Sequence, residues 1–235
     1  MFQPPQPINK NNALNAEHVS YLGTTGSCKT TAIRKLGFIK KSDQVLFFDP
    51  YEDHSNKAFL GLKVRKFTDW GEFYRAAWKA RKGTGAFRLA MVGKERTPEN
   101  LELFARIAWS LGNGNHKKRL HTVVEELAKF TKSAGKLDGV AGELWTGGRG
   151  FGLIMHTTFQ RGQEVPKTVL DESAHFYIGA VGSSRGAKYV GEYLDVPVEA
   201  ILSLQTFRDT QTHADYILKS PGIGNWKQHK IDPRK

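Results

Sequence analysis

The sequence predicts an α/β protein with a mostly parallel central sheet flanked by helices. Short apolar runs alternate along the chain with segments of helical periodicity, and such alternation is typical of strands joined by crossover helices. Several runs are apolar throughout rather than at every second residue, as expected for strands covered on both faces. Polar or glycine-rich motifs follow three of the runs. Because ligands bind at the carboxyl ends of strands in such sheets, the three motifs predict one shared site.

The first expected strand, 18–23, leads into a helix that begins at Lys29 and ends near Gly37. The next apolar run, 44–50, is closed by Asp-Pro, since proline cannot donate to a sheet ladder. Residues 62–67 alternate between apolar and charged side chains and predict a short strand.

A helix is expected from Trp70. Aromatic and alanine side chains recur there at helical spacing, which puts them on one face, and Asp69 precedes them as the candidate N-cap. The members of this stripe are Trp70, Phe73, Tyr74, Ala77 and Trp78. We expect the stripe to face the core.

The remaining elements follow the same reasoning. Residues 86–92 predict a strand, and Thr97-Pro98 opens a helix to about Leu111, with a cap followed by proline in the first turn. Further strands are expected at 120–126, 152–158, 174–180 and 215–219, and a helix is expected at 183–194.

These elements predict one domain at residues 16–220. It lies between an extended arm at 1–15, rich in proline and asparagine, and a basic tail at 221–235. No apolar run approaches the roughly 20 residues of a membrane span, and no charged-then-apolar signal pattern is present. We therefore expect no intrinsic membrane span. One cysteine excludes an intramolecular disulfide.

The chain is strongly basic, with 35 Lys and Arg against 23 Asp and Glu and a net charge of +12 at pH 7. Proteins of this kind commonly bind polyanions: DNA, RNA or an anionic membrane surface. A solvated basic surface gives the same composition, so charge by itself leaves both interpretations open.

The motif after the first strand, "GTTGSCKTT", is similar to a phosphate-binding loop. In such a loop successive backbone N–H groups point at phosphate, and glycines keep Cβ atoms away from its oxygens. Lys29 would reach the β- and γ-phosphates, and the Thr30 hydroxyl would ligate Mg²⁺. An ordinary turn before a helix is the alternative. The predicted nucleotide-binding residues are Gly23, Thr24, Thr25, Gly26, Ser27, Cys28, Lys29, Thr30 and Thr31.

Cys28 stands where the loop pattern has its second glycine. Its Cβ would lie close to the phosphate, but the side chain is small and the Lys-Thr pair that follows is retained. We expect the site to work with this substitution. A thiol at a helix N-terminus is also one whose pKa can be lowered.

Two carboxylates, Glu125 and Glu126, follow the apolar run that contains Val123 and Val124. Mg²⁺ prefers a carboxylate together with phosphate oxygens, and a second carboxylate can orient or activate the attacking water. Successive side chains on a strand point to opposite faces. Both can therefore serve one site only if the chain is leaving the strand there; a surface acidic pair is the alternative.

Gln160 follows the next apolar run and could hydrogen-bond the γ-phosphate or the attacking water, or could simply cap the strand end. Phosphoryl transfer gains from an arginine near the developing charge, supplied in cis or by a neighbour. Arg149, in "TGGRGFG", is the first candidate and Arg185, in "GSSRGAK", is the second.

Other chemistries find less support. The eight histidines show no metal-ligand spacing, and a zinc site is not expected with one cysteine. No Ser-His-Asp arrangement can be argued. The guanine-reading Asn-Lys-x-Asp pattern is absent from the sequence, so the expected cofactors are ATP and Mg²⁺.

Three segments together resemble the FtsK–HerA superfamily of DNA-pumping ATPases. They are "YLGTTGSCKTT", "TVVEELAKF" and "GGRGFGLIMHTTFQRGQEVPKTVLDESAHFYIG". The third is the most specific, because it combines an arginine and glycine before a strand with a glutamine after it and "EVPKTVL" beyond. The resemblance runs from about His18 to Ile178.

The resemblance implies a RecA-like P-loop NTPase and a role for each candidate. Lys29 and Thr30 match the Walker A residues, and Glu125 takes the place of the family's metal-site aspartate. Glu126 matches the catalytic glutamate. Gln160 is similar to the sensor, and Arg149 resembles the arginine finger that acts on a neighbouring subunit.

A basic chain of this length is most similar to the genome-packaging ATPases of membrane-containing icosahedral phages such as tectiviruses and corticoviruses. Such ATPases imply a homo-oligomeric, hexamer-like ring that drives double-stranded DNA through a capsid vertex. The expected partners are DNA and capsid vertex proteins. The expected locations are the packaging vertex of the virion and the host cytoplasm.

Two basic loops flank the strand that precedes Glu125 and are candidates for DNA contact, since DNA backbone binding uses Lys and Arg. Solvated charge is the alternative. The candidate residues are Lys117, Lys118, Arg119, Lys132 and Lys136.

Other functions remain open to the sequence. A motor of the same superfamily could serve conjugation or filamentous-phage assembly. A small phosphotransferase also fits the length and the loop, although no arginine lid is apparent. A binding protein disabled at Cys28 is the fourth possibility.

Overall fold

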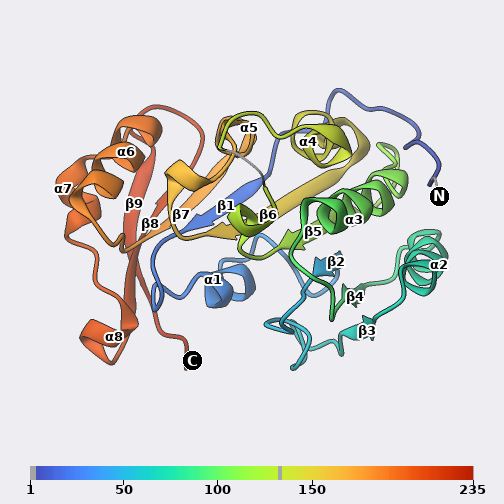
Figure 1. Cartoon of the computed structure of the whole chain (residues 1–235), viewed down its shortest axis with the longest axis horizontal. Coiled ribbons are helices and arrows are strands. Elements are labelled where there is room, and N and C mark those ends of the chain that lie inside the picture. Colours follow the sequence, from blue (N-terminus) through green and yellow to red (C-terminus); the bar gives the residue numbers. More distant parts are fainter. Residues whose placement is uncertain (1–3, 132–133, 235) are drawn as a thin grey trace.

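A single mixed sheet forms the centre of the protein (Figure 1). The computed structural model describes residues 4–131 and 134–234. Nine strands of these residues form the sheet in the order β3-β4-β2-β5-β6-β1-β7-β8-β9. The strands are β1 Val19–Leu22, β2 Gln44–Phe48, β3 Arg65–Phe67, β4 Phe87–Met91, β5 Leu120–Val124, β6 Leu153–Phe159, β7 His175–Gly179, β8 Ala214–Lys219 and β9 Trp226–Ile231.

Seven adjacent strands, from β3 to β7, run parallel, and β8 and β9 add an antiparallel edge. The expected α/β class with a mostly parallel sheet is confirmed. Eight helices connect the strands within the described ranges. They are α1 Lys29–Lys35, α2 Trp70–Arg81, α3 Pro98–Ser110, α4 Gly139–Thr146, α5 Lys167–Glu172, α6 Ser184–Leu194, α7 Val198–Leu202 and α8 Phe207–Thr210.

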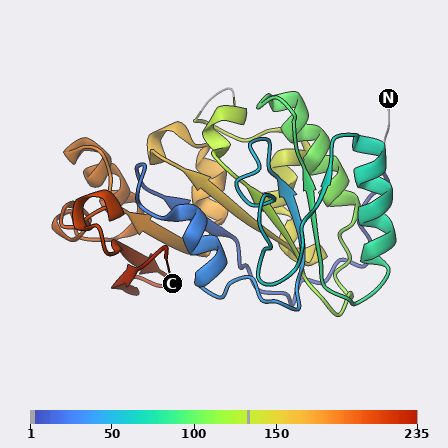
Figure 2. The same ribbon diagram turned by 90° about the horizontal axis from the view of Figure 1, so that it is seen from below.

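The core has two layers because the central strands are buried on both faces. On β2, Phe48 packs with Phe104 and Phe130 on one face, while Phe47 packs with Phe59 on the other. Figure 1 shows α3, α4, α5 and α6 on one side of the sheet and α1 on the other. In the view from below, α1 lies in front of the strands (Figure 2). This two-sided cover accounts for the continuous apolar runs of the sequence.

Local sequence signals set the helix starts. The Asp69 side chain accepts from the backbone N–H of Glu72 at the start of α2, and Thr97 accepts from Asn100 at the start of α3. Both predicted caps are confirmed. The stripe on α2 is buried only in part: Phe73 and Ala77 are in the core, but Trp78 is exposed. The reason is position, since α2 covers β3 and β4 at the edge of the sheet.

The arm before the domain runs along the amino edge of the sheet. The Ile8 N–H donates to the Gly112 carbonyl at 3.0 Å, and the Asn11 N–H donates to the Gly150 carbonyl at 2.8 Å. Among the described residues, no helix combines the length and the apolar character needed to cross a lipid bilayer.

The basic C-terminal segment differs from the expectation. We expected residues 221–235 to form a tail outside the domain, but residues 226–231 form β9, which pairs antiparallel with β8 from Ala214↔Ile231 to Lys219↔Trp226. The hairpin turns at "SPGIGN", with positive φ at Gly222 and Gly224. The sequence did not predict this strand because an edge strand buries few of its residues, and the Lys and Gln side chains of β9 are exposed.

Several buried histidines lie on or next to the central strands of the sheet. His18 is held neutral by two bonds: its Nδ1 accepts from the Met155 N–H and its Nε2 donates to the Trp145 carbonyl, each at 3.1 Å. Burial lowers the pKa of His18 to about 4. Burial, with the neighbouring charge of His121, also lowers the pKa of His156.

These histidines predict a loss of stability in mild acid. An unfolded His takes up a proton near pH 6.5, and the folded His18 does not until about pH 4. The stabilisation is therefore complete above pH 6.5 and is lost as pH falls below it, by about 2 kcal/mol at pH 5 for His18. Urea unfolding at pH 7.5 and pH 5 measures this. His18→Gln should reduce the difference, and the exposed control His229→Gln should leave it unchanged. A wild type equally stable at both pH values would contradict the prediction.

Candidate nucleotide-binding site

The three predicted motifs meet at one edge of the sheet because their strands are neighbours. The order β5-β6-β1 places the segments after Val124, Phe159 and Leu22 side by side. The register is level, with Leu22 opposite Phe159 and Val124 opposite Thr157. This is the carboxyl edge of the parallel strands, as predicted.

The loop between β1 and α1 is fixed to the sheet on both sides. The Gly23 N–H donates to the Phe159 carbonyl at 3.3 Å, and the Thr24 N–H donates to the Ala180 carbonyl at 2.7 Å. Gly23 has φ 145°, and a Cβ there would lie 2.6 Å from the Ser27 Oγ. Only glycine fits this position, so the first glycine of the motif is set by backbone shape and by close packing.

The backbone conformation at Cys28 shows why the loop pattern has its second glycine at this position. Cys28 has φ 59° and ψ 27°, in the left-handed region, where a Cβ costs about 1–2 kcal/mol. The loop keeps its conformation despite the side chain. The half-buried thiol packs on the α1 side of the sheet. Burial raises the pKa of Cys28, the Lys35 charge lowers it less, and Asp232 raises it. The expectation of a lowered thiol pKa is therefore wrong.

Lys29 lies across the loop. Its Nζ donates to the Gly23 carbonyl at 2.7 Å and to the Thr24 carbonyl at 3.4 Å. Burial lowers the pKa of Lys29, while the charges of Glu126 and Glu125 raise it and offset part of that effect. Both predicted carboxylates therefore act on the loop lysine.

Glu125 is a buried carboxylate with several polar neighbours. Its Oε1 lies 2.7 Å from the His54 Nε2, and its Oε2 accepts from the Thr158 hydroxyl at 3.4 Å. Burial raises the pKa of Glu125. The contacts with His54 and the Thr30 hydroxyl and the charge of Lys29 together lower it by more, so the net shift of the pKa is downward. The carboxylate is held ionised at the edge of the loop.

Glu126 meets the condition that the sequence set for two adjacent carboxylates. Its backbone is left-handed, with φ 54° and ψ 49°, and its N–H donates to the Thr158 hydroxyl at 2.8 Å. The strand has ended at Val124, so Glu125 and Glu126 are not forced onto opposite faces.

Thr30 and Glu125 fit a shared Mg²⁺ ion. The Thr30 hydroxyl lies close enough to the Glu125 carboxyl to lower its pKa, and both oxygen types suit Mg²⁺. No cluster of three or more His, Cys, Asp or Glu side chains that could hold a metal occurs within residues 4–131 and 134–234. A Mg²⁺ site here would therefore take its remaining ligands from water and phosphate, as is usual for this ion.

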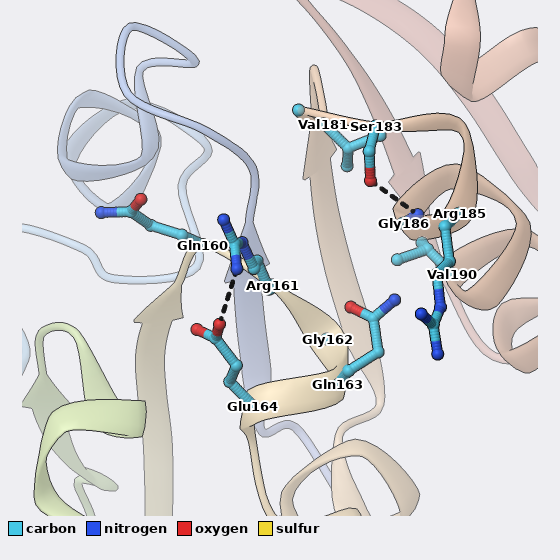
Figure 3. A pocket seen from close by; sticks show the side chains of 11 residues that line it. Gln160, Arg161, Gly162, Gln163, Glu164, Val181, Ser183, Arg185, Gly186 and Val190 are labelled. Atoms are coloured by element: carbon cyan, nitrogen blue, oxygen red, sulfur yellow. Dashed lines mark hydrogen bonds and ion pairs between the residues drawn. The ribbon is translucent and has the colours of Figure 1, made fainter.

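Gln160 follows β6 at the same edge and is exposed. It borders a cavity of about 380 Å³ between the loop after β6 and the start of α6. Figure 3 shows the Gln160 side chain pointing away from Gln163 and Arg185. The Arg161 Nη1 in the same loop lies 3.1 Å from the Glu164 Oε1.

No protein-family model matches the chain. Protein P9 of Pseudoalteromonas phage PM2 is 28% identical over 198 residues, which cover 84% of this chain and 83% of that protein.

Solved structures share the fold. The genome-packaging NTPase B204 from Sulfolobus turreted icosahedral virus 2, in complex with AMPPCP, superposes with a TM-score of 0.69 at 12% identity, over 92% of this chain and 98% of that one. The bacterial conjugative coupling protein TrwB superposes with a TM-score of 0.61 at 12% identity, over 98% and 89%. The chain has a P-loop NTPase fold of the kind seen in these two proteins.

On this NTPase fold the two candidate arginines lie at opposite edges. Arg149 precedes β6, and its Nη1 donates to the carbonyls of Asn12 at 3.0 Å and Leu14 at 2.6 Å. β6 has seven residues and so spans roughly 20 Å, which separates Arg149 from the loop of its own chain. Arg185 is exposed in the first turn of α6 and borders the cavity beside Gln160.

The candidate DNA contacts are not gathered on one surface. Lys117, Lys118 and Arg119 precede β5 at the amino edge, where the Arg119 Nη1 donates to the Asn15 carbonyl at 3.2 Å. Lys136 is exposed beyond the other end of β5. Lys132 lies outside the described residues.

Sequence reasoning missed two segments that lie against the candidate site. His54 follows β2, the neighbour of β5, and its only sequence signal was a polar segment after an apolar run. Residues 206–208 cover the loop from the C-terminal part of the chain: the Phe207 N–H donates to the Gly26 carbonyl at 2.9 Å, and the Arg208 Cγ lies 3.3 Å from where a Gly26 Cβ would be. No motif marks that segment.

The left-handed backbone of Cys28 leads to a prediction about nucleotide affinity. Cys28→Gly should bind a fluorescent ATP analogue within about threefold of wild type, because glycine adopts this conformation without strain. Cys28→Val should bind about tenfold or more weakly, because a β-branched residue is strongly disfavoured at positive φ. Cys28→Ala is the matched control and should resemble wild type. Equal affinity of the Val and Ala variants would show that the backbone at this position does not matter for binding.

Proposed function

We propose that this protein is an ATP hydrolase that drives double-stranded DNA into a viral capsid. The observation that carries the proposal is the grouping of Lys29, Thr30, Glu125 and Glu126 at one edge of the sheet. A cationic group for phosphate, a hydroxyl and carboxylate for Mg²⁺, and a second carboxylate are the parts that nucleoside triphosphate hydrolysis needs.

We propose a separate role for each of these residues. Backbone N–H groups of the loop hold the phosphates, and Lys29 neutralises the β- and γ-phosphates. Thr30 and Glu125 would hold Mg²⁺, which would supply charge stabilisation to the transferring phosphoryl group. Glu126 orients the attacking water and accepts its proton, and Gln160 contacts the γ-phosphate or that water.

We also propose that the protein forms a ring. Arg149 lies at the edge of the sheet away from its own loop, which supports a role for it at the nucleotide of a neighbouring subunit. A closed, hexamer-like homo-oligomer with heterologous contacts satisfies this requirement at every interface.

DNA is the polymer that we propose this ATPase moves, because the chain has a net charge of +12 and phosphate backbones bind Lys and Arg. The likeness to a genome-packaging NTPase and to a phage protein supports packaging at a capsid vertex. The proposed locations are the virion vertex and the host cytoplasm. The likeness to TrwB makes transport of DNA in conjugation the second candidate.

We expect ATP hydrolysis by the wild type to rise on addition of double-stranded DNA and to fall at least a hundredfold in Lys29→Ala. The reason is that Lys29 carries the charge that meets the γ-phosphate. Phosphate release with and without DNA measures this, and Lys41→Ala, an exposed lysine outside the loop, is the control. Phosphate transfer to a nucleoside without DNA would instead indicate a small-molecule phosphotransferase. Nucleotide binding without turnover would indicate a binding protein.

We also expect Arg149→Ala and Lys29→Ala subunits, each inactive, to regain activity when mixed. A mixed interface can combine the intact Lys29 of one subunit with the intact Arg149 of its neighbour, whereas a site built within one chain cannot be restored in this way. Phosphate release across a series of mixing ratios tests this, with Arg185→Ala mixed in the same way as the comparison. Recovery with Arg185→Ala alone would transfer the role to that residue.

A further inference from the structure

The loop after β2 lies beside Glu125, the proposed Mg²⁺ ligand, and hydrogen bonds fix its path. Asp49, which is 1% exposed, accepts the backbone N–H of Asp53 at 2.8 Å, of His54 at 3.1 Å and of Ser55 at 2.8 Å. Three bonds to one carboxylate define the path of the chain through His54. The α1 residue Arg34 adds a bond from its Nη2 to the Asp53 carbonyl at 3.1 Å.

The His54 side chain has little freedom. It is 1% exposed, and its ring lies 5.2 Å from the Phe47 centroid and 5.7 Å from the Phe59 centroid. Aromatic neighbours at these distances confine the imidazole to one orientation. In that orientation Nε2 lies 2.7 Å from the Glu125 Oε1.

The other polar atom of the ring has no competing role. His54 Nδ1 makes no hydrogen bond with any of the described residues, and the close contact between Nε2 and the Glu125 Oε1 is not aligned as a hydrogen bond either. A carboxylate only accepts, so a hydrogen bond between this ring and Glu125 requires the proton on Nε2. The second oxygen of Glu125, Oε2, accepts from the Thr158 hydroxyl at 3.4 Å.

A glutamate at this position needs such a contact. It has one more rotatable bond than the aspartate that the family resemblance places there, and each additional rotamer makes a single carboxylate position less populated. We propose that His54 is a positioning residue that holds the Glu125 carboxylate in the orientation that receives Mg²⁺ beside Thr30. The outer partners of a metal ligand fix its orientation in this way, and their loss costs about 10- to 100-fold in metal affinity or activity.

This inference rests on the proposed nucleotide site, so its test measures metal binding directly. Mn²⁺, which replaces Mg²⁺, is titrated by electron paramagnetic resonance into protein that holds a non-hydrolysable ATP analogue. His54→Ala should weaken Mn²⁺ binding about 10- to 100-fold. His54→Gln, whose amide can place an N–H near the former Nε2, should recover most of the affinity. Affinity for the analogue without metal should change little in either variant.

The matched control is His121→Ala. His121 is also buried and also contacts a carboxylate, since its Nε2 is 3.4 Å from the Asp43 Oδ2. It lies on β5, the strand that leads to Glu125, but at the opposite end of that strand. Its loss should lower stability comparably and leave Mn²⁺ affinity unchanged. If His54→Ala does not fold, His54→Leu fills the space between the two phenylalanine rings and carries the same expectation.

Three results would overturn the inference: unchanged Mn²⁺ affinity in a folded His54→Ala or His54→Leu variant, equal loss in His54→Gln and His54→Ala, or equal loss in His121→Ala. Failure of the proposed function looks different. A wild type that binds neither the analogue nor Mn²⁺ in its presence would refute the nucleotide site itself.

Discussion

The pairing of β1 between β6 and β7 is the constraint on which the site depends. β1 has four residues and is buried on both faces, and its register sets Leu22 level with Phe159 and Ile178. The loop that follows is therefore suspended between two strand ends, and each end accepts one loop N–H. A shift of one residue in this register would turn every side chain of β1 to the opposite face and move the loop away from Glu125.

The charges at this edge depend on one another. A carboxylate as buried as Glu125 is costly unless it is paired and hydrogen-bonded, and here His54, Thr30, Thr158 and Lys29 supply those contacts. Removing one partner of such a group costs more than the pair itself contributes, because the other charge stays buried. Lys29 and Glu125 are thus stabilised together, because the charge of each favours the charged form of the other.

Backbone strain at the site is held by the same frame. Cys28 and Glu126 both have left-handed backbones, a conformation that non-glycine residues adopt at a cost. Strain of this kind persists where the surroundings over-determine the chain. At Cys28 the strand ends and the Phe207 bond to Gly26 fix the loop, and at Glu126 the Thr158 hydroxyl holds the N–H.

The sequence by itself determined the α/β class and most strand positions, and it predicted the chemistry proposed for Lys29, Thr30, Glu125 and Glu126. Those features are local: continuous apolar runs report burial, and the loop motif reports backbone shape. Tertiary structure alone decided that His54 contacts Glu125, that residues 206–208 cover the loop, that β9 joins the sheet, and that Arg149 lies at the far edge from its own loop. Each of these depends on contacts between residues distant in the chain. Pairing of that kind follows from strand order, and the periodicity of a single sequence does not contain strand order.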